Sequence, residues 1–333
     1  MDTTFTSKLL RWYGTYGRDL PWRHTSDPYP IWLSEIILQQ TRVVQGMDYW
    51  YRFMEKWPTV EQLAEASEDE VLKLWQGLGY YSRARNLHKA ARQICADGHF
   101  PNTLETIKEL KGVGDYTAAA IASFAFNIPA AAVDGNVYRV LSRYDGVDIP
   151  INTGEGKKFF SSIAGELIPE DRPADFNQAM MDFGAIQCTP KSPDCTLCPF
   201  IEECVAYRSD KVEVLPVKLR NLKVKTRNLQ YIYIRCQGET AIHRRPSGDI
   251  WQGLWEPFLI ENAPVPQMNG VMTLVASQVK HVLSHRILLA DFYLLDTDHR
   301  PSLPEDYIWI KEENIEQYAV PRLIDKLITK LRR

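Results

Sequence analysis

The segment IKELKGVGDYTAAAIASFAF, residues 107–126, decides the fold of the first half of this chain. Gly112 and Gly114 flank a short turn, and an alanine-rich helical pattern follows directly. Glycines allow backbone N–H groups to approach a phosphate, and the N-terminus of the next helix adds partial positive charge. We therefore predict two helices joined by a hairpin at about 106–126, with both glycines contacting a nucleic-acid backbone. A plain connection between two helices is the alternative.

The chain changes character along its length. Up to about residue 208, apolar residues recur every three to four positions and are interrupted by Gly, Pro, Asn and Asp, as in a series of amphipathic helices. Residues 209–227 are rich in Lys and Arg, and later segments such as NLQYIYIRC and ILLADFYLL alternate like strands. These patterns predict a multidomain protein: an all-α domain at 1–208, an extended basic linker at 209–227 and an α+β domain at 228–333.

Composition limits the possible function classes. The chain has 333 residues, of which 45% are hydrophobic and 24% charged, and its net charge is −3. This charge argues against a protein that coats nucleic acid regardless of sequence, but it allows a local basic face. The N-terminus lacks a signal-peptide pattern, and no apolar run reaches the ~18 residues of a membrane span. We therefore expect a cytoplasmic protein that makes no membrane contact and whose thiols are reduced.

A second unusual stretch is CTPKSPDCTLCPFIEEC, residues 188–204. Its four cysteines follow the spacing C-x6-C-x2-C-x5-C, and four thiolates on one loop bind either zinc or an iron–sulfur cluster. Zinc sites made of four cysteines usually pair two C-x2-C units, whereas this loop has one, so the spacing favours [4Fe–4S]. The predicted ligands are Cys188, Cys195, Cys198 and Cys204. The isolated Cys95 and Cys236 are expected to be small buried residues.

Two carboxylates lie in contexts that suit catalysis. Glu35 is surrounded by apolar residues in WLSEIIL, so partial desolvation is expected to raise its pKa toward that of a general acid. Asp134 precedes a helical pattern and is expected to act as a helix N-cap. A carboxylate held by capping hydrogen bonds stays ionised and is suited to stabilising a cation. An ordinary surface glutamate and a purely structural cap are the alternatives.

The motifs LKGVGDYTA, VDGNVYRVLSR and the four-cysteine loop occur in the order found in the helix-hairpin-helix DNA glycosylases, which this chain resembles. LPWR, LSEIILQQT, GLGYYSRARNLHKAA and FNQAMMDFGA resemble the adenine glycosylase branch, and WQGLWE and HVLSH resemble the Nudix-like domain of that branch. The resemblance implies a helix-hairpin-helix catalytic domain with a [4Fe–4S] loop and a Nudix-like C-terminal domain. It also implies a base-excision-repair enzyme that flips adenine out of an A:8-oxoguanine or A:G mispair and hydrolyses its N-glycosidic bond.

The resemblance implies catalytic roles for four residues. Glu35 would protonate adenine at N7, Asp134 would stabilise the cationic sugar, and Asn136 would orient the attacking water. Tyr116 occupies the position at which the endonuclease III branch has a Lys that forms a Schiff base with the sugar. Tyrosine cannot form an imine, so we expect base removal without strand cleavage.

Further residues are expected to bind DNA. The resemblance implies an adenine pocket that contains Trp22, Arg23 and Gln178, and it implies that Gln40 and Tyr81 enter the base stack when adenine is flipped out. Core packing is the alternative for Tyr80 and Tyr81, and one of the two is expected to pack in this way. The residues expected to contact phosphates are Arg83, Arg85 and Lys191. The residues expected to recognise 8-oxoguanine are Leu283, Ser284 and His285. Relatives usually have Phe at position 283, so Leu is expected to lower affinity for the lesion.

Two other functions compete with this one. A bifunctional glycosylase/lyase is disfavoured by Tyr116, and a non-catalytic iron–sulfur protein that binds DNA is disfavoured by Glu35 and Asp134. A Nudix hydrolase is not expected, since no Glu-rich metal-binding helix follows Gly253. The expected partner is double-stranded DNA with an A:8-oxoguanine or A:G mispair, bound by a monomer at the nucleoid of a bacterial cell.

Overall fold

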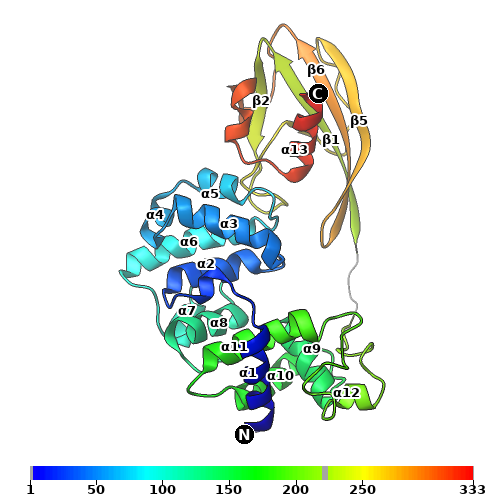
Figure 1. The fold of residues 1–333 in the computed structure, drawn as a ribbon. Helices are drawn as coiled ribbons and strands as arrows, with labels where there is room; N and C mark the ends of the chain where they lie inside the picture. The colour runs from blue at the N-terminus through cyan, green and yellow to red at the C-terminus, as the bar shows by residue number, and fades with distance from the viewer. Residues whose placement is uncertain (1–2, 220–223, 333) are drawn as a thin grey trace. The chain divides into compact units, whose positions relative to one another are not determined.

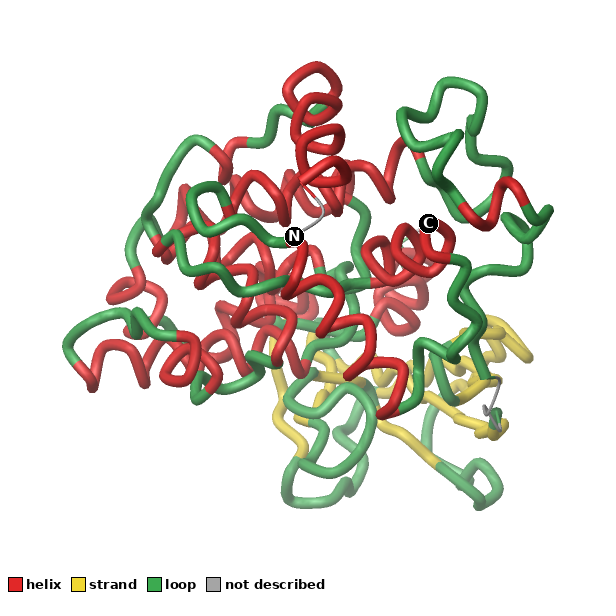
Figure 2. The backbone as a smooth tube through the Cα atoms, turned by 90° about the horizontal axis from the view of Figure 1, so that it is seen from below, coloured by secondary structure: helices red, strands yellow, loops and turns green. Residues whose placement is uncertain are grey.

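The computed structural model describes residues 3–219 and 224–332, which fall into two compact units. The first unit combines Met1–Ala64 with Lys89–Arg220, and the second combines Glu65–His88 with Asn221–Arg333. The described part of the first unit is helical, and the strands belong to the second (Figures 1 and 2). The predicted helical and strand-containing parts are confirmed, but the chain at 65–88 belongs to the second unit.

Helices build the first unit around a core of aromatic side chains. They are α1 (Thr3–Tyr16), α2 (Pro28–Leu38), α3 (Val43–Lys56), α4 (Val60–Glu65), α7 (Leu104–Lys108), α8 (Asp115–Phe126), α9 (Gly135–Asp145), α10 (Gly154–Leu167), α11 (Pro173–Asp182) and α12 (Val205–Arg208). The 3-10 turn η1 (Pro21–Arg23) follows α1, and the π-helical turn η2 (Phe183–Gln187) extends α11. The rings of Phe5, Phe160 and Phe176 are buried together in the core.

The hairpin between α7 and α8 has the predicted geometry. A capping box between Thr103 and Thr106 starts α7. Gly112 then adopts a φ of 83°, in the left-handed region that favours glycine, and α8 begins immediately after Gly114. The small side chains of Ala118–Ala122 are buried, so α8 lies close against α2 and α11. The predicted helix-hairpin-helix is therefore confirmed.

A buried amide fixes the loop that leads from α8 to α9. Asn177 on α11 is 1% exposed, and its side-chain oxygen accepts a hydrogen bond of 3.0 Å from the backbone N–H of Ala132. Its side-chain nitrogen donates to the carbonyl of Ala130 at 2.9 Å and to the hydroxyl of Ser123 at 2.8 Å. Because Asp134 lies at the end of this loop, α11 determines where that carboxylate is placed.

The predicted linker at 209–227 differs from the structure. Leu215 is buried, and its carbonyl accepts a hydrogen bond of 3.1 Å from Arg143. Further along, the carbonyl of Val217 accepts one of 3.0 Å from the backbone N–H of Ile151. The chain therefore packs against the first unit beyond residue 209, because its apolar and carbonyl groups find partners there. Residues 220–223 lie outside the described residues, and a strand begins at Lys225.

The second unit contains one mixed sheet. Its strands are β1 (Lys225–Cys236), β2 (Glu239–Arg244), β3 (Trp255–Glu256), β4 (Phe258–Ile260), β5 (Val271–Val282), β6 (Arg286–Thr297) and β7 (Tyr307–Lys311). The order is β3-β2-β1-β6-β5, with β4 paired to β1 and β7 to β2, and the β1–β6 pair is parallel.

Helices accompany the sheet of the second unit. They are α5 (Glu68–Trp75), the first part of α6 (Ser82–Asp97), the 3-10 turn η3 (Glu312–Gln317) and α13 (Arg322–Leu331). Figure 1 shows α13 alongside the sheet, and its Leu323 and Leu327 are buried in one cluster with Tyr231 and Phe292. This arrangement agrees with the predicted α+β domain.

Replacing Asn177 by Ala should destabilise the protein by about 3 kcal/mol, because buried backbone groups at Ala130 and Ala132 lose their hydrogen bonds. Urea denaturation measures this change. The exposed Asn102→Ala is the matched control, and it should shift the midpoint little. Equal shifts for the two variants would show that the buried amide does not hold the loop.

Candidate active site

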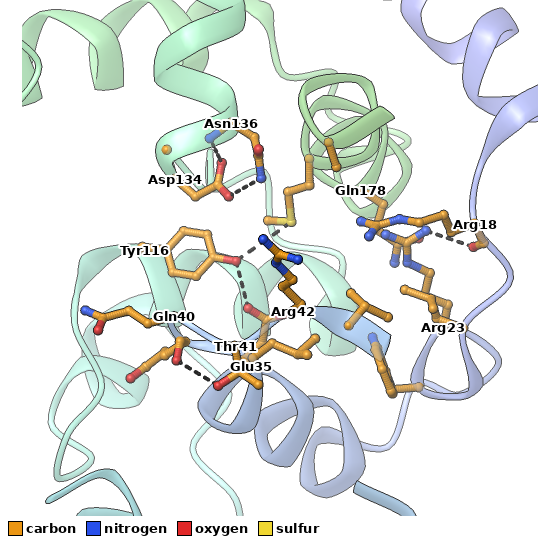
Figure 3. Close-up of a pocket in the computed structure, with 18 of the residues that line it drawn as sticks. Arg18, Arg23, Glu35, Gln40, Thr41, Arg42, Tyr116, Asp134, Asn136 and Gln178 are labelled. Carbon is orange, nitrogen blue, oxygen red and sulfur yellow. Dashed lines mark hydrogen bonds between the residues drawn. The ribbon is translucent and has the colours of Figure 1, made fainter. Parts of the chain in front are cut away.

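A cavity of about 870 Å³ opens in the first unit, and it is lined by side chains from η1, α2, α8, α11 and the N-terminus of α9 (Figure 3). The cavity contains many of the residues predicted to be catalytic or to bind adenine. These are Trp22, Arg23, Glu35, Gln40, Tyr116, Asp134, Asn136 and Gln178. The fold therefore brings together segments that are more than 100 residues apart in the sequence.

Glu35 projects into this cavity from α2, a helix whose residues are buried on nearly all sides. Asp27 caps the helix, and its side chain accepts a hydrogen bond from the backbone N–H of Tyr29. Glu35 is 7% exposed, so the predicted desolvation is confirmed. Burial raises its pKa to about 7. The negative charge of Asp134 contributes in the same direction, while the hydroxyl of Tyr116 and the charge of Arg23 act in the opposite one.

Tyr116 connects α8 to this carboxyl group. Its hydroxyl donates a hydrogen bond of 2.9 Å to Oε2 of Glu35 and lies 3.8 Å from the sulfur of Met181 (Figure 3). Burial and the two nearby carboxylates raise the pKa of Tyr116 well above its usual value, so the hydroxyl keeps its proton. It remains a hydrogen-bond donor to Glu35 and does not become a base.

Asp134 is the N-cap of α9, as predicted. Its Oδ1 accepts hydrogen bonds from the backbone N–H groups of Asn136 and Val137 at 2.8 and 2.9 Å. Its Oδ2 accepts a third from the Asn136 side chain at 2.8 Å. Burial raises the pKa of Asp134 above its usual value although these bonds lower it, whereas the capping bonds were expected to keep this carboxylate ionised.

Asn136 is occupied at both ends of its amide. Besides the bond to Asp134, its side-chain oxygen accepts a hydrogen bond of 2.9 Å from Arg139. In this arrangement Asn136 aims Asp134, so its predicted role in orienting water stays a prediction.

The residues predicted to form an adenine pocket are held by further side chains. Trp22 packs against Trp50 with ring centroids 5.6 Å apart, and Gln178 accepts a hydrogen bond of 2.6 Å from the hydroxyl of Tyr13. Arg23 donates to the buried Asp182, with bonds of 2.8 Å from Nη1 and Nη2. Asp182 was not predicted from the sequence, although an acidic residue within the apolar run MMDFG was a usable signal.

The expectation for Tyr81 is corrected by its burial. Tyr81 is 6% exposed, and a ring packed in this way cannot enter a base stack without leaving the core. The neighbouring Tyr80 is 50% exposed and has a φ of 46°, so its ring is the one available to a partner. Within the second unit, its hydroxyl shares a hydrogen bond of 2.5 Å with that of Ser284. Gln40 is exposed at the cavity with a φ of 57°.

Arg83 does not match its predicted role in phosphate binding, whereas that of Arg85, which is half-buried, stays a prediction. Arg83 is 9% exposed and lies over the ring of Trp75, 5.0 Å from its centroid. Arg85 donates a hydrogen bond of 2.6 Å to the carbonyl of Gln252. Both guanidinium groups are therefore used within the second unit, because they stack on or bond to groups of the same unit.

The residues expected to recognise 8-oxoguanine form the turn between β5 and β6. The backbone N–H of Leu283 donates to the carbonyl of Arg286 at 2.8 Å, which closes the turn. Leu283 is half-buried against the apolar core below α13, whereas Ser284 and His285 are exposed. The turn thus exposes the polar side chains of Ser284 and His285, while Leu283 packs on the apolar core.

The four clustered cysteines line one hollow of about 30 Å³ in the first unit and form no disulfide. Arg143 lines it too, and donates a hydrogen bond of 3.4 Å to the sulfur of Cys188. Within the described residues, no three His, Cys, Asp or Glu side chains converge as one metal ion requires. The four cysteine side chains around this hollow are the donor set of a [4Fe–4S] cluster, in which each cysteine binds a different iron. Lys191 is exposed on this loop.

The two remaining cysteines differ from each other. Cys236 is buried, as predicted. Cys95 is exposed near the end of α6, so the expectation of burial was wrong for this residue. Among the helices that the structure describes, none has the length and apolarity needed to cross a membrane.

Comparisons with known proteins agree with this architecture. Residues 33–159 match the family model of the HhH-GPD superfamily base excision DNA repair proteins, and residues 230–330 match that of the NUDIX domain. The chain is 32% identical to the adenine DNA glycosylase of Buchnera aphidicola subsp. Baizongia pistaciae, over 99% of this chain and 97% of that protein.

Other relatives match over a shorter range. The mouse (Mus musculus) adenine DNA glycosylase is 45% identical over 62% of this chain, but the match spans 42% of the mouse protein. Among solved structures, a thermostable thymine-DNA glycosylase matches with a TM-score of 0.58 and 35% identity, covering 62% of this chain and 96% of that one.

The raised pKa of Glu35 should make stability depend on pH. The folded state keeps a proton up to about pH 7 that the unfolded state releases near pH 4.5, so this carboxyl lowers stability as the pH rises through that window. Glu35→Gln should therefore gain about 2 kcal/mol relative to the wild type between pH 5 and pH 8, measured by urea denaturation. The exposed Glu166→Gln is the control. A difference that stays constant with pH would contradict the raised pKa.

Proposed function

We propose that this chain, which belongs to the adenine DNA glycosylase family, removes adenine from A:8-oxoguanine and A:G mispairs in double-stranded DNA by hydrolysing the N-glycosidic bond. The observation that carries the proposal is one cavity in which a buried carboxyl of raised pKa, Glu35, lies near a second carboxylate, Asp134. The cavity volume of about 870 Å³ is within the range of small-molecule sites, so it can hold a flipped-out base.

Glu35 is suited to be the general acid of this reaction. Adenine is a poor leaving group until a ring nitrogen, N7, is protonated. With a pKa of about 7, Glu35 is protonated in a substantial fraction of molecules at neutral pH and is still acidic enough to transfer the proton. The hydrogen bond from Tyr116 fixes the direction of the carboxyl group.

Asp134 is suited to stabilise the sugar as the base departs. The departing base leaves positive charge on the sugar, and a carboxylate aimed by three N–H groups offers fixed negative charge to it. The side chain at position 116 is a phenol, which cannot form a Schiff base. Water therefore completes the reaction, and the DNA strand stays intact.

Recognition of the opposite base is assigned to the turn between β5 and β6. Ser284 and His285 offer hydrogen-bonding groups to the edge of 8-oxoguanine. Leu283 offers an apolar contact surface that has no aromatic ring. Tyr80, rather than Tyr81, is the aromatic side chain expected to enter the base stack, together with Gln40. Gly112, Gly114 and Lys191 are proposed to contact phosphates, since the hairpin has the backbone geometry for it and Lys191 is exposed.

The four cysteines that line the hollow are proposed to bind a [4Fe–4S] cluster. Arg143 would offset part of its negative charge through the bond to Cys188. When bound, the cluster would act as a cross-link of the loop that carries Lys191, because hydrolysis requires no electron transfer. The cysteine loop would then be kept in one conformation for DNA.

Single-turnover release of adenine from an A:8-oxoguanine duplex tests the proposal. The wild type should release adenine and leave the strand unbroken until alkali is added, and Glu35→Gln should be slower by about 10²-fold or more at unchanged DNA affinity. An A:G duplex and a T:A duplex measure specificity. Duplex binding without adenine release by either protein would favour a non-catalytic DNA-binding protein. Nicking as fast as adenine release would favour a glycosylase/lyase.

Loss of the cluster should weaken DNA binding and leave most helices folded. Cys198→Ala is the test variant and the exposed Cys95→Ala the matched control. Iron content, circular dichroism and the dissociation constant for a mispaired duplex are measured for each. Cys198→Ala should lose iron and bind DNA at least 10-fold more weakly, whereas Cys95→Ala should behave as the wild type. Full binding and activity without iron would refute a structural role for the cluster.

A further inference from the structure

Asp182, the last residue of α11, is a fully buried carboxylate that the reaction described above does not use. It accepts hydrogen bonds of 2.8 Å from the backbone N–H and Nε of Arg18, and two more of 2.8 Å from the guanidinium of Arg23. Burial alone raises the pKa of Asp182, but these bonds and charges outweigh it, and the net pKa lies below the usual value. Asp182 is therefore an anion shared by two arginines.

Arg23 lies at the junction between this anion and the general acid. Its charge acts on Glu35 and lowers the pKa of that carboxyl. The N–H groups of Arg23, however, are directed to Asp182 and to the carbonyl of Arg18, the latter at 2.9 Å from Nη1. Figure 3 shows Arg18 and Arg23 beside each other near Gln178. Both side chains line the same cavity, so the bonds to Asp182 and to the Arg18 carbonyl keep the guanidinium from turning to the carboxyl of Glu35, where it would act as a charge-assisted donor.

Such a bond would remove the acid that the reaction needs. An ion pair favours the ionised form of a carboxyl group, and its proton would then be lost at neutral pH. The titratable and charged groups that line the cavity with Glu35 are Arg18, Arg23, Arg42, Tyr116, Asp134 and Arg139. Arginines outnumber carboxylates in this set. The negative charge of Asp182, which is hydrogen-bonded to Arg23, therefore reduces the excess positive charge around the cavity.

We propose that Asp182 is a positioning residue, which holds the guanidinium of Arg23 away from Glu35 and offsets its charge so that Glu35 keeps a proton to donate. The proposal rests on the proposed function of Glu35 as the general acid. It assigns the acidic residue of MMDFG a part in the reaction although it has no access to the base. It also explains why Arg23 contacts the adenine cavity without neutralising the acid within it.

Titration of Glu35 by NMR, with ¹³C at the carboxyl carbon of glutamate, tests this without relying on turnover. The Glu35 signal is assigned by its loss in Glu35→Gln. In Asp182→Asn the midpoint should fall by about one pH unit, because two arginines lose their shared anion. In Arg18→Gln it should rise, because Asp182 then offsets a single cation. Asp175→Asn, on the same helix and paired with Arg172 at the surface, is the matched control and should leave the midpoint unchanged.

Opposite shifts in the two variants distinguish charge from structural damage. If Asp182→Asn does not fold, Arg18→Gln decides alone, and a midpoint that stays constant or falls would overturn the proposal. The proposal is also overturned if Asp182→Asn folds and the titration midpoint of Glu35 does not change.

The pH dependence of adenine release gives the second reading. In Asp182→Asn the decline of the rate at high pH should begin about one unit lower, so that the loss is about 10-fold at pH 8 and small at pH 6. Asp182→Glu, which keeps the charge, should restore much of the rate at pH 8. If the Glu35 midpoint shifts as expected while the wild type releases no adenine, the proposed function fails, and what stands is the effect of Asp182 on the pKa of Glu35. If the wild type is active and a folded Asp182→Asn has the same pH profile, the proposal for Asp182 fails and the proposed function stands.

Discussion

The carboxyl group of Glu35 lies among apolar side chains of α2, where an ionised group has few water molecules to solvate it. Burial disfavours the charged form of this carboxyl, and the neighbouring polar groups raise or lower its pKa further. Tyr116 donates a hydrogen bond to the carboxyl, and Asp134 opposes its ionisation through negative charge. The pKa of Glu35 thus depends on groups from α8 and from the start of α9, and no single helix contains the site.

The helix-hairpin-helix places the proposed phosphate contact close in sequence to a residue that bonds to Glu35. The tight turn at Gly112 ends where α8 begins, and α8 carries Tyr116 one turn or less from its N-terminus. The hairpin turn and the residue that donates a hydrogen bond to Glu35 therefore lie on one short segment. Asn177 on α11 ties the following loop to the same core, and this fixes Asp134 as well. The packed helices therefore fix the positions of Glu35 and Asp134 relative to each other.

The second unit contributes a different kind of surface. Its sheet and α13 form an apolar core beneath the turn that carries Ser284 and His285, so the turn is held by packing while its polar side chains face outward. The chain at 65–88 belongs to this unit and brings Tyr80 to Ser284. Tyr80 and the turn proposed to recognise the opposite base thus come from distant parts of the sequence and belong to one unit.

Local pattern determined much of this protein without the structure. Helical periodicity, the two hairpin glycines, the cysteine spacing and the apolar surroundings of Glu35 depend on residues close in sequence, and so the helical domain, the hairpin and the buried acid were predicted. Burial of one tyrosine rather than its neighbour depends on what packs from elsewhere, and this is why Tyr81, which is buried, was predicted to enter the base stack in place of the exposed Tyr80. The hydrogen bonds of Arg85 with Gln252, and of Arg23 with Asp182, join segments far apart in the chain. Only the tertiary structure decided them, because an ionised side chain takes its role from the charges that folding places beside it.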